Sequence, residues 1–156
     1  CNFIVPGTIV LNLPEQSRIR CFVAQVAVAC PEGYDPDPRV LEFAKSDPAF
    51  RFSLHRTPKE AAVDADVVFT DVWASMGQEE ERAIRAKAFA GYQINQELMD
   101  LTHPGCMVQH CLPAHRGEEI TADIFEAHAD EIFDEAENRL HAQKAVMYLL
   151  LKDPED

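Results

Sequence analysis

Four short apolar runs, rich in β-forming residues and separated by segments with helix signals, most strongly constrain the fold. Residues 22–30, 66–72 and 106–111 lack a consistent polar face, which predicts buried strands, and residues 50–54 alternate apolar with polar side chains, which predicts a half-exposed strand. Strands that alternate with helices usually form a sheet with crossover connections and parallel neighbours. The sequence therefore predicts an α/β domain with a mostly parallel sheet.

Helix signals lie between these runs. Asp37-Pro38 offers an N-cap and a first-turn proline, Thr57 and Glu60 have the spacing of a capping box, and Asn95 can cap a further helix. The predicted helices run from these caps to residues 45, 63 and 101, and further helices are predicted at residues 78–90, 121–127 and 135–152. A brief strand is predicted at residues 131–134.

Composition narrows the class of protein. The 156 residues include 14 Lys plus Arg against 27 Asp plus Glu, a formal net charge of −13, which disfavours binding to nucleic acid. The longest apolar stretches, residues 26–30 and 145–151, are far shorter than the roughly 20 residues of a membrane span, so no membrane partner is expected. Five cysteines and no basic-then-apolar leader favour a reducing compartment, the cytoplasm. One domain is expected, and the Cys at position 1 predicts a fragment of a longer protein.

In open α/β sheets ligands bind beyond the carboxyl ends of the strands, so residues that follow strands are candidates. The predicted strand at residues 66–72 delivers Asp71, Trp73, Ser75 and Met76 into one loop. An acid beside a hydroxyl and exposed backbone amides can receive the ammonium and carboxylate of an amino acid. Alternatively, Asp71 and Ser75 only cap the next helix and Trp73 packs in the core.

His110 and Cys111 end another predicted strand. Adjacent strand residues point to opposite faces, so His110 is expected to face away from Cys111 and not to activate it as a nucleophile. Cys111 is then either a small buried apolar residue or a ligand contact. His103 and His115 lie nearby, but their spacing does not match a structural zinc site, and no metal is expected.

Two further features bear on ligands. Arg139, in the predicted last helix, can meet an anion or pair on the surface with Asp134 or Glu135. No glycine-rich phosphate loop is found, since Val5-Pro6-Gly7 lacks the further glycines, so a nucleotide cofactor is disfavoured.

Three longer segments carry more information about function than the spacing of single residues does. They read DVWASMGQE at residues 71–79, HCLPAHRG at 110–117 and FDEAENRLHAQK at 133–144, and they closely resemble the ornithine carbamoyltransferases. The resemblance runs from about residue 26 to 151 and covers the ornithine-binding half, so it implies a Rossmann-like, doubly wound sheet in a single domain over residues 1–156. The carbamoyl-phosphate half has no counterpart here, and residues 1–25 depart from the family pattern.

The resemblance also implies a function. The family transfers a carbamoyl group from carbamoyl phosphate to the δ-amine of L-ornithine, giving L-citrulline and phosphate with no metal or organic cofactor, and it forms homotrimers. The roles implied are ornithine binding for Asp71, Ser75 and the Met76 backbone, contact with the reacting groups for Cys111 and the Leu112 carbonyl, and polarisation of the carbamoyl oxygen for Arg139. Alternatively, the chain is a non-catalytic amino-acid-binding or subunit-interaction domain. In either case we expect the isolated chain to be inactive.

Overall fold

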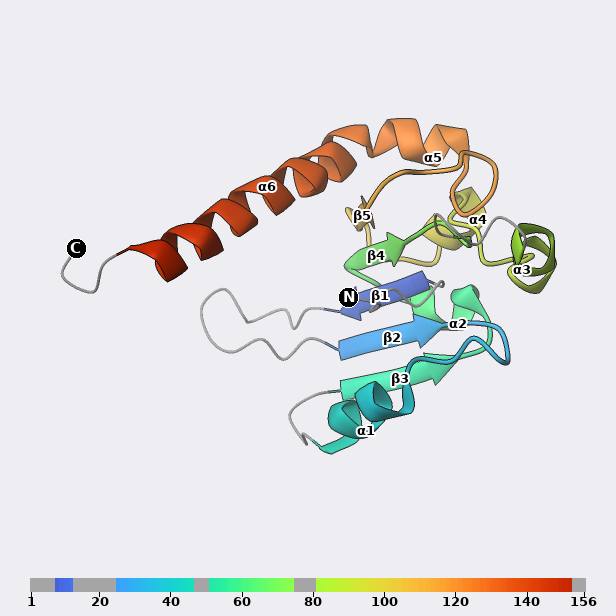
Figure 1. Ribbon diagram of the computed structural model, residues 1–156. Helices are drawn as coiled ribbons and strands as arrows, with labels where there is room; N and C mark the ends of the chain where they lie inside the picture. The colour runs from blue at the N-terminus through green and yellow to red at the C-terminus, as the bar shows by residue number, and fades with distance from the viewer. Residues whose placement is uncertain (1–7, 13–24, 47–50, 75–80, 153–156) are drawn as a thin grey trace.

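The computed structural model describes residues 8–12, 25–46, 51–74 and 81–152. Its centre is a five-stranded sheet in the order β3-β2-β1-β4-β5 (Figure 1). The strands are β1 (Thr8–Asn12), β2 (Gln25–Ala29), β3 (Arg51–His55), β4 (Val67–Thr70) and β5 (Met107–His110). Each of the four predicted strand regions therefore overlaps one of these strands.

The direction of the strands gives the fold class. β2 pairs in parallel with β3, β4 pairs in parallel with β5, and β1 runs antiparallel to both of its neighbours. Four strands thus point one way and β1 points the other way. The predicted α/β fold with parallel strands is confirmed. The exception is β1, at residues where no strand is predicted and where the sequence departs from the family pattern.

Helices connect and follow the strands. They are α1 (Pro38–Ser46), α2 (Pro58–Ala62), α3 (Arg82–Ala88), α4 (Gln96–Met99), α5 (Ala122–Ala127) and α6 (Ala129–Leu151). The predicted strand at residues 131–134 is wrong, because these residues lie in the first turns of α6. Two apolar residues are too few to hold a strand, and Asp130 and Glu131 suit the positive end of a helix dipole.

The two predicted side-chain caps differ in outcome. Asn95 caps α4 as predicted, since its Oδ1 accepts a hydrogen bond of 3.0 Å from the Leu98 backbone N–H. Thr57 occupies the N-cap position of α2 but makes no side-chain capping bond, so the predicted capping box is not formed. The carboxylate of Glu60 lies 3.8 Å from His55 Nδ1 instead.

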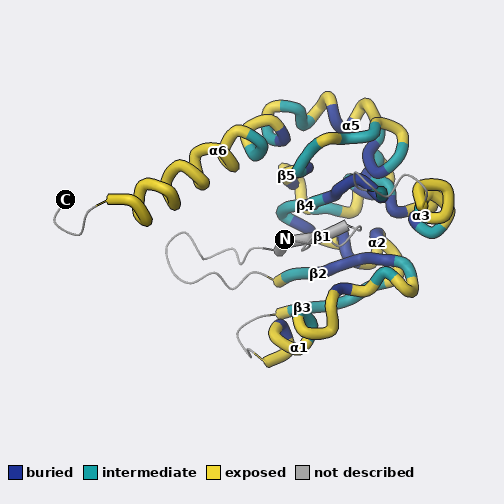
Figure 2. Tube along the Cα trace, viewed as in Figure 1, coloured by how far each residue is buried: buried dark blue, intermediate teal, exposed yellow. Residues whose placement is uncertain are grey.

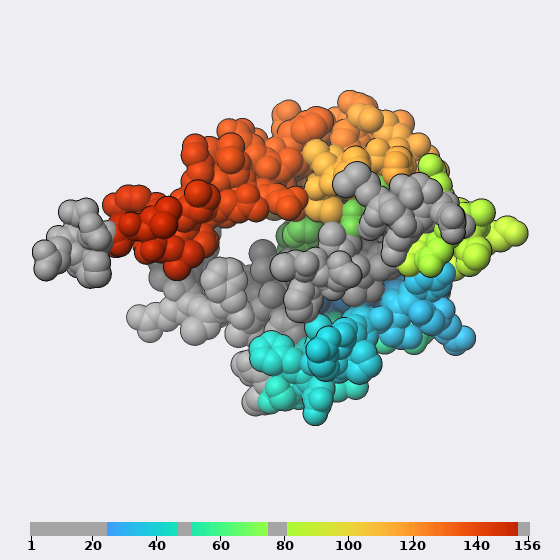
Figure 3. All heavy atoms as spheres, in the orientation of Figure 1, coloured from blue at the N-terminus to red at the C-terminus, as the bar shows by residue number. Residues whose placement is uncertain are grey.

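The hydrophobic core is formed by residues of β2, β4 and β5, by α2 and by the segments that follow β4 and β5. Figure 2 shows buried residues concentrated in the strands and the adjoining loops, whereas residues 137–151 of α6 are exposed. The largest fully buried apolar side chains are Phe89, Ile94, Ile120, Ile132, Val68 and Val108. α6 packs against β5 near its beginning and then extends beyond the sheet (Figure 1), and its last turns project from the body of the molecule in Figure 3. Within the described residues, no helix is both long and apolar enough to span a bilayer.

Candidate functional site

The ends of β4 and β5 bring two of the candidate residues together. Thr70 pairs with His110 in the parallel ladder, so Asp71 and Cys111 leave the sheet side by side at its carboxyl edge. Cys111 Sγ donates a hydrogen bond to Asp71 Oδ1 across 3.0 Å, and Asp71 itself is buried. Both strand ends therefore contribute to one place in the structure.

The environment of Cys111 determines its chemistry. Burial, the hydrogen bond to Asp71 and the negative charges of Asp71 and Glu135 together raise the pKa of the Cys111 thiol to about 12. A thiol with such a pKa stays protonated at neutral pH, and the thiolate is the nucleophilic form. Cys111 is therefore suited to contact a ligand through a neutral S–H group rather than to attack it.

His110 is fully buried and hydrogen-bonded through both ring nitrogens. Nε2 lies 3.0 Å from Glu119 Oε1, and Nδ1 accepts a hydrogen bond of 2.9 Å from the Leu112 backbone N–H. One ring nitrogen lies within 4.8 Å of both Cys111 Sγ and an Asp71 oxygen, so the expectation that His110 faces well away from Cys111 is wrong. The chain turns back over the ring directly after β5, at Leu112, which has a φ of +52°.

The inference that His110 does not activate Cys111 nevertheless has structural support. The Cys111 thiol donates to Asp71, and His110 Nδ1 already receives the Leu112 N–H. Neither ring nitrogen is left free to take the thiol proton.

Two acidic residues that contribute to this region were missed by the sequence reasoning. Glu119 is fully buried, and its carboxylate binds His110 and the His115 backbone N–H. Glu135, in α6, lies close enough to Cys111 for its charge to raise the thiol pKa. No pattern distinguishes Glu119 from the part-exposed Glu118 beside it, so a signal for its burial is lacking in the sequence.

The remaining candidates have different outcomes. Arg139 is exposed on α6, one helical turn after Glu135, and within the described part of the chain it forms no ion pair, so the alternative of surface pairing finds no support there. Leu112 is half-buried next to Cys111, whereas Ser75 and Met76 lie outside the described residues.

The alternative for this loop is that Trp73 packs in the core and that Asp71 only caps the next helix. The structure supports the first part and not the second. Trp73 is buried and stacks on Phe89 with ring centroids 6.2 Å apart, so it packs in the core as that alternative expects. Asp71 accepts a hydrogen bond of 2.8 Å from the Val72 N–H, and the N-cap position of α3 is Glu81. Asp71 is thus not the cap of α3 and remains available at the strand end.

Two groups of side chains are close enough to suggest a metal ion. The ligand atoms of Asp71, His110 and Cys111 lie within 4.8 Å of one another. The same holds for His115, Glu118 and Glu119, a group that the sequence did not indicate. In the first group these atoms already bind one another or the Leu112 backbone. In the second, Glu118 pairs with Arg82. We therefore assign no metal to either group.

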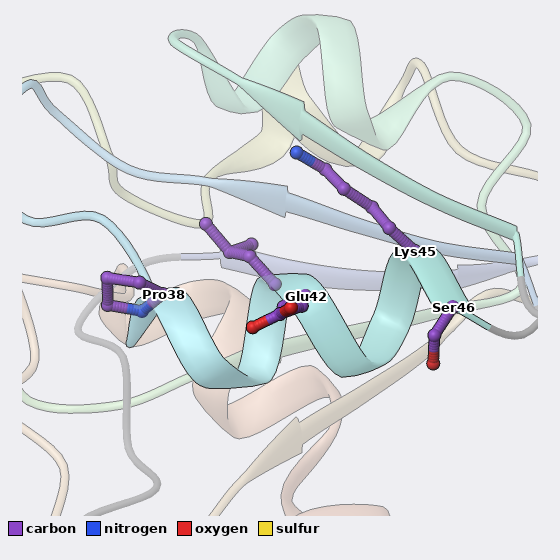
Figure 4. Close-up of a pocket in the computed structure, with 5 residues that line it drawn as sticks. Pro38, Glu42, Lys45 and Ser46 are labelled. Atoms are coloured by element: carbon purple, nitrogen blue, oxygen red, sulfur yellow. The ribbon is translucent and has the colours of Figure 1, made fainter.

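Two surface hollows that are lined by described residues include neither Asp71 nor Cys111. One, of about 510 Å³, is lined by residues of α1, including Glu42 and Lys45, beside the opposite edge strand β3 (Figure 4). Another, of about 400 Å³, is lined by α4, the turn before β5 and α5. Neither is lined by a residue that sequence reasoning placed in the site.

Comparison with known protein families shows which family this arrangement belongs to. The model of the family described as "Aspartate/ornithine carbamoyltransferase, Asp/Orn binding domain" matches residues 17–150. The chain belongs to this family. The match begins after β1, so the family pattern includes β2 to β5 and both strand ends of the site.

Individual relatives agree with this assignment. The chain is 56% identical over 127 residues to the ornithine carbamoyltransferase of Geobacter metallireducens and 52% identical over 131 residues to that of Thermococcus kodakarensis. These matches cover 81% and 82% of this chain but only 42% of each relative. The chain thus spans less than half the length of the relatives that it matches.

Solved structures give the same coverage. The anabolic ornithine carbamoyltransferase of Campylobacter jejuni superposes with a TM-score of 0.75 at 41% identity, over 80% of this chain and 42% of that one. The enzyme of Pyrococcus furiosus superposes with a TM-score of 0.71 at 49% identity, over 79% and 40%. The fold is therefore that of the ornithine-binding domain of this family.

Proposed function

We propose that this chain provides the ornithine-binding half of an enzyme that transfers a carbamoyl group from carbamoyl phosphate to the δ-amine of L-ornithine, giving L-citrulline and phosphate. The observation that carries the proposal is the contact between Asp71 and Cys111 at the carboxyl ends of two parallel strands. Both residues stand in the segments that match the family, and such strand ends are where α/β sheets bind ligands.

The chemistry of the two residues suits an amine substrate. A buried carboxylate such as that of Asp71 attracts an ammonium group, and the hydrogen bond between them is charge-assisted. The Cys111 thiol, held neutral, can orient a nearby amine without adding a second negative charge. In this proposal Ser75 and the Met76 backbone complete the ornithine site together with Asp71.

The carbamoyl end of the reaction is assigned to Leu112 and Arg139. We propose that the Leu112 carbonyl accepts a hydrogen bond from the carbamoyl amide and that Arg139 polarises the carbamoyl oxygen, as a donor aimed at developing negative charge does in other acyl transfers. The exposed Arg139 lies one turn beyond Glu135, whose charge reaches Cys111. Positioning and charge stabilisation then supply catalysis with no metal or organic cofactor.

The whole enzyme needs more than this chain. We propose that a carbamoyl-phosphate-binding domain completes the site and that the assembly is a homotrimer in the cytoplasm that serves arginine biosynthesis or another step of arginine and ornithine metabolism. The coverage of relatives supports the need for a further domain, since only 42% of the Geobacter metallireducens relative corresponds to the present chain. A net charge of −13 also makes this chain by itself a poor receptor for a phosphate dianion.

A titration of the isotope-labelled chain with L-ornithine, followed by NMR, tests the proposal. We expect weak, saturable shifts at Asp71, Cys111 and their neighbours, smaller shifts with L-aspartate, and none in Asp71→Asn. Asp100→Asn is the matched control, because Asp100 is an exposed carboxylate at the end of α4. Equal responses to ornithine in wild type and Asp71→Asn would overturn the assignment of the site.

The coverage of relatives also favours a second candidate, a non-catalytic amino-acid-binding or subunit-interaction domain. The two candidates differ when the chain is mixed with the portion of the Geobacter metallireducens enzyme that this chain does not match. Citrulline formation that depends on both proteins supports the enzyme, whereas ornithine binding without citrulline supports the second candidate.

A further inference from the structure

We propose that Glu119 is a positioning residue that sets the shape of the turn carrying Cys111 and Leu112, and that it acts through a neutral His110. This inference rests on the proposed function for its purpose, but its geometry concerns the chain alone. The proposal assigns His110 no part in proton transfer.

The carboxylate of Glu119 joins both ends of the turn. Its Oε1 accepts a hydrogen bond of 2.5 Å from the His115 backbone N–H and lies 3.0 Å from His110 Nε2. His110 is the last residue of β5, so one carboxylate oxygen ties the end of the strand to a residue five positions later. The intervening segment, which includes Cys111 and Leu112, is closed into a loop of fixed span.

These contacts also determine the form of the imidazole. Nδ1 of His110 accepts the Leu112 N–H, so it cannot carry a proton, and Nε2 must carry one to bond to the carboxylate of Glu119. His110 is therefore the neutral Nε2–H tautomer, and the bond made at one nitrogen selects the bond made at the other. By fixing the proton on Nε2, Glu119 leaves Nδ1 unprotonated, so Nδ1 can accept the hydrogen bond from the Leu112 N–H.

The backbone conformation of Leu112 is unfavourable by itself and requires a stabilising contact. Its φ of +52° lies in the left-handed region, which costs a residue other than glycine roughly 1–2 kcal/mol. The bond from the Leu112 N–H to His110 stabilises this conformation, which places the Cys111 side chain against Asp71 and turns the chain sharply after the strand. Residues in strained conformations often occur where a site must be held in place.

The placement of Glu119 supports a specific role rather than a surface contact. Glu119 and His110 both have side chains with 0% exposure, and burial of a charged group is tolerated only when it is well bonded. Oε2 of Glu119 has no partner within the described residues, so all of the hydrogen bonds found there converge on Oε1. The carboxylate thus serves the turn and His110, and nothing else in the described structure.

The first test uses NMR on the complete 156-residue chain without any substrate. The ring nitrogen shifts of His110 should report a neutral Nε2–H tautomer at pH 7, and the amide hydrogens of Leu112 and His115 should exchange slowly. In Glu119→Ala both amides should exchange at least about tenfold faster, as expected for the loss of a hydrogen bond to a charged group. Glu118→Ala is the matched control and should leave both rates unchanged.

The second test measures L-ornithine binding by the same variants. Glu119→Ala should weaken binding about tenfold through the displaced turn, whereas Glu119→Gln, which retains an acceptor oxygen, should recover most of the affinity. Urea unfolding of each variant separates a local effect from loss of the fold. If Glu119→Ala does not fold, the proposal is tested by the tautomer of His110 in wild type and by the ornithine affinity of Glu119→Gln.

Two results would overturn the proposal. One is a charged His110, or an Nδ1–H tautomer, in the wild-type chain. The other is unchanged amide exchange at Leu112 and His115 in a folded Glu119→Ala variant. If wild type shows the expected tautomer and exchange but binds no ornithine, the proposed function fails and the positioning of the turn stands.

Discussion

The Cys111 thiol and the Asp71 carboxylate are joined by a hydrogen bond of 3.0 Å, although 40 positions separate them in the chain. The bond exists because β4 and β5 are parallel neighbours that end in register, with Thr70 opposite His110. Burial and the neighbouring Asp71 together raise the pKa of the thiol and keep it protonated, and the thiol in turn gives the buried carboxylate a hydrogen-bond donor. Predictions for both residues follow from this pair.

Cys111 should be slow to alkylate. With its pKa raised to about 12, the thiol holds far less thiolate at pH 8 than a free cysteine does, and the greater nucleophilicity of a basic thiolate offsets only part of the loss. We expect iodoacetamide to modify Cys111 more than about tenfold more slowly than free cysteine at pH 8. Peptide mapping by mass spectrometry measures the rate at each cysteine.

The same measurement tests the role of Asp71. Replacing Asp71 by Asn removes a negative charge, so the pKa of Cys111 should fall and its alkylation should accelerate. Asp100→Asn should leave the rate unchanged. Fast modification of Cys111 in the wild-type chain would show that the thiol is not held in its neutral form.

In an assembled enzyme that contains this domain, Cys111→Ala should lower the rate and the affinity for ornithine without abolishing turnover. The loss should be roughly tenfold to a hundredfold, the effect of removing one hydrogen bond to a charged group. Steady-state kinetics separates kcat from KM, and Cys106→Ala, at the opposite end of β5, is the control. A trapped carbamoyl-cysteine adduct would contradict the assignment, because a neutral ligand contact forms no covalent intermediate.

Local patterns in the sequence were sufficient to predict the parts of the site that depend on strand ends. Apolar runs that stop at Asp71 and Cys111 predict two buried strands, and alternation with helices predicts that these strands are parallel. The segments that resemble the family then predict their roles, which remain proposals. Asn95 was also predictable, because an N-cap is a contact between residues three positions apart.

Long-range contacts were not predictable from such patterns. Nothing in the sequence indicates that Glu119 is buried against His110, since that contact depends on how the chain returns after the turn at Leu112. The start of α6 was misplaced because Ile132 and Phe133 suggested a strand, whereas the acidic residues around them fit a first helical turn. The antiparallel β1 lies where the chain does not follow its family.

Acid should destabilise the fold partly through Glu119. Burial raises the pKa of this carboxyl, but hydrogen bonds from His110 and the His115 backbone outweigh burial, and the net effect is a pKa below its ordinary value. A carboxyl with a depressed pKa contributes stability that is complete above its unfolded pKa of about 4.3 and is lost as pH falls through the folded value.

The free energy of unfolding in urea, measured from pH 7 down to pH 3, tests this. Wild type should lose stability below about pH 5, and Glu119→Gln should be less stable at pH 7 but show a flatter decline in that range. Glu118→Gln, which removes the same formal charge from the neighbouring residue, should keep the wild-type slope. Parallel curves for wild type and Glu119→Gln would contradict the prediction.

The two N-cap residues should differ in their contributions to stability. Asn95→Ala removes a capping bond to the Leu98 N–H and should lower the free energy of unfolding by about 1 kcal/mol. Thr57→Ala removes no capping bond, and because Thr57 is exposed its effect should stay within about 0.5 kcal/mol. Chemical denaturation of both variants measures the difference, and equal losses would show that the Asn95 bond does not stabilise α4.

The isolated chain should be catalytically silent even when it is folded and binds ornithine. Carbamoyl phosphate carries a dianionic phosphate that needs several directed donors, and the single arginine that we assign to this substrate, Arg139, is proposed to act on the carbamoyl end. The net charge of −13 repels the same ligand. Without a second domain to hold carbamoyl phosphate beside ornithine, the reaction also loses a proximity effect worth roughly 7–11 kcal/mol. A colorimetric or radiometric citrulline assay on the purified 156-residue chain, with no other protein present, measures the outcome. Citrulline above the background of an Arg139→Ala control would show that this chain holds both substrates by itself.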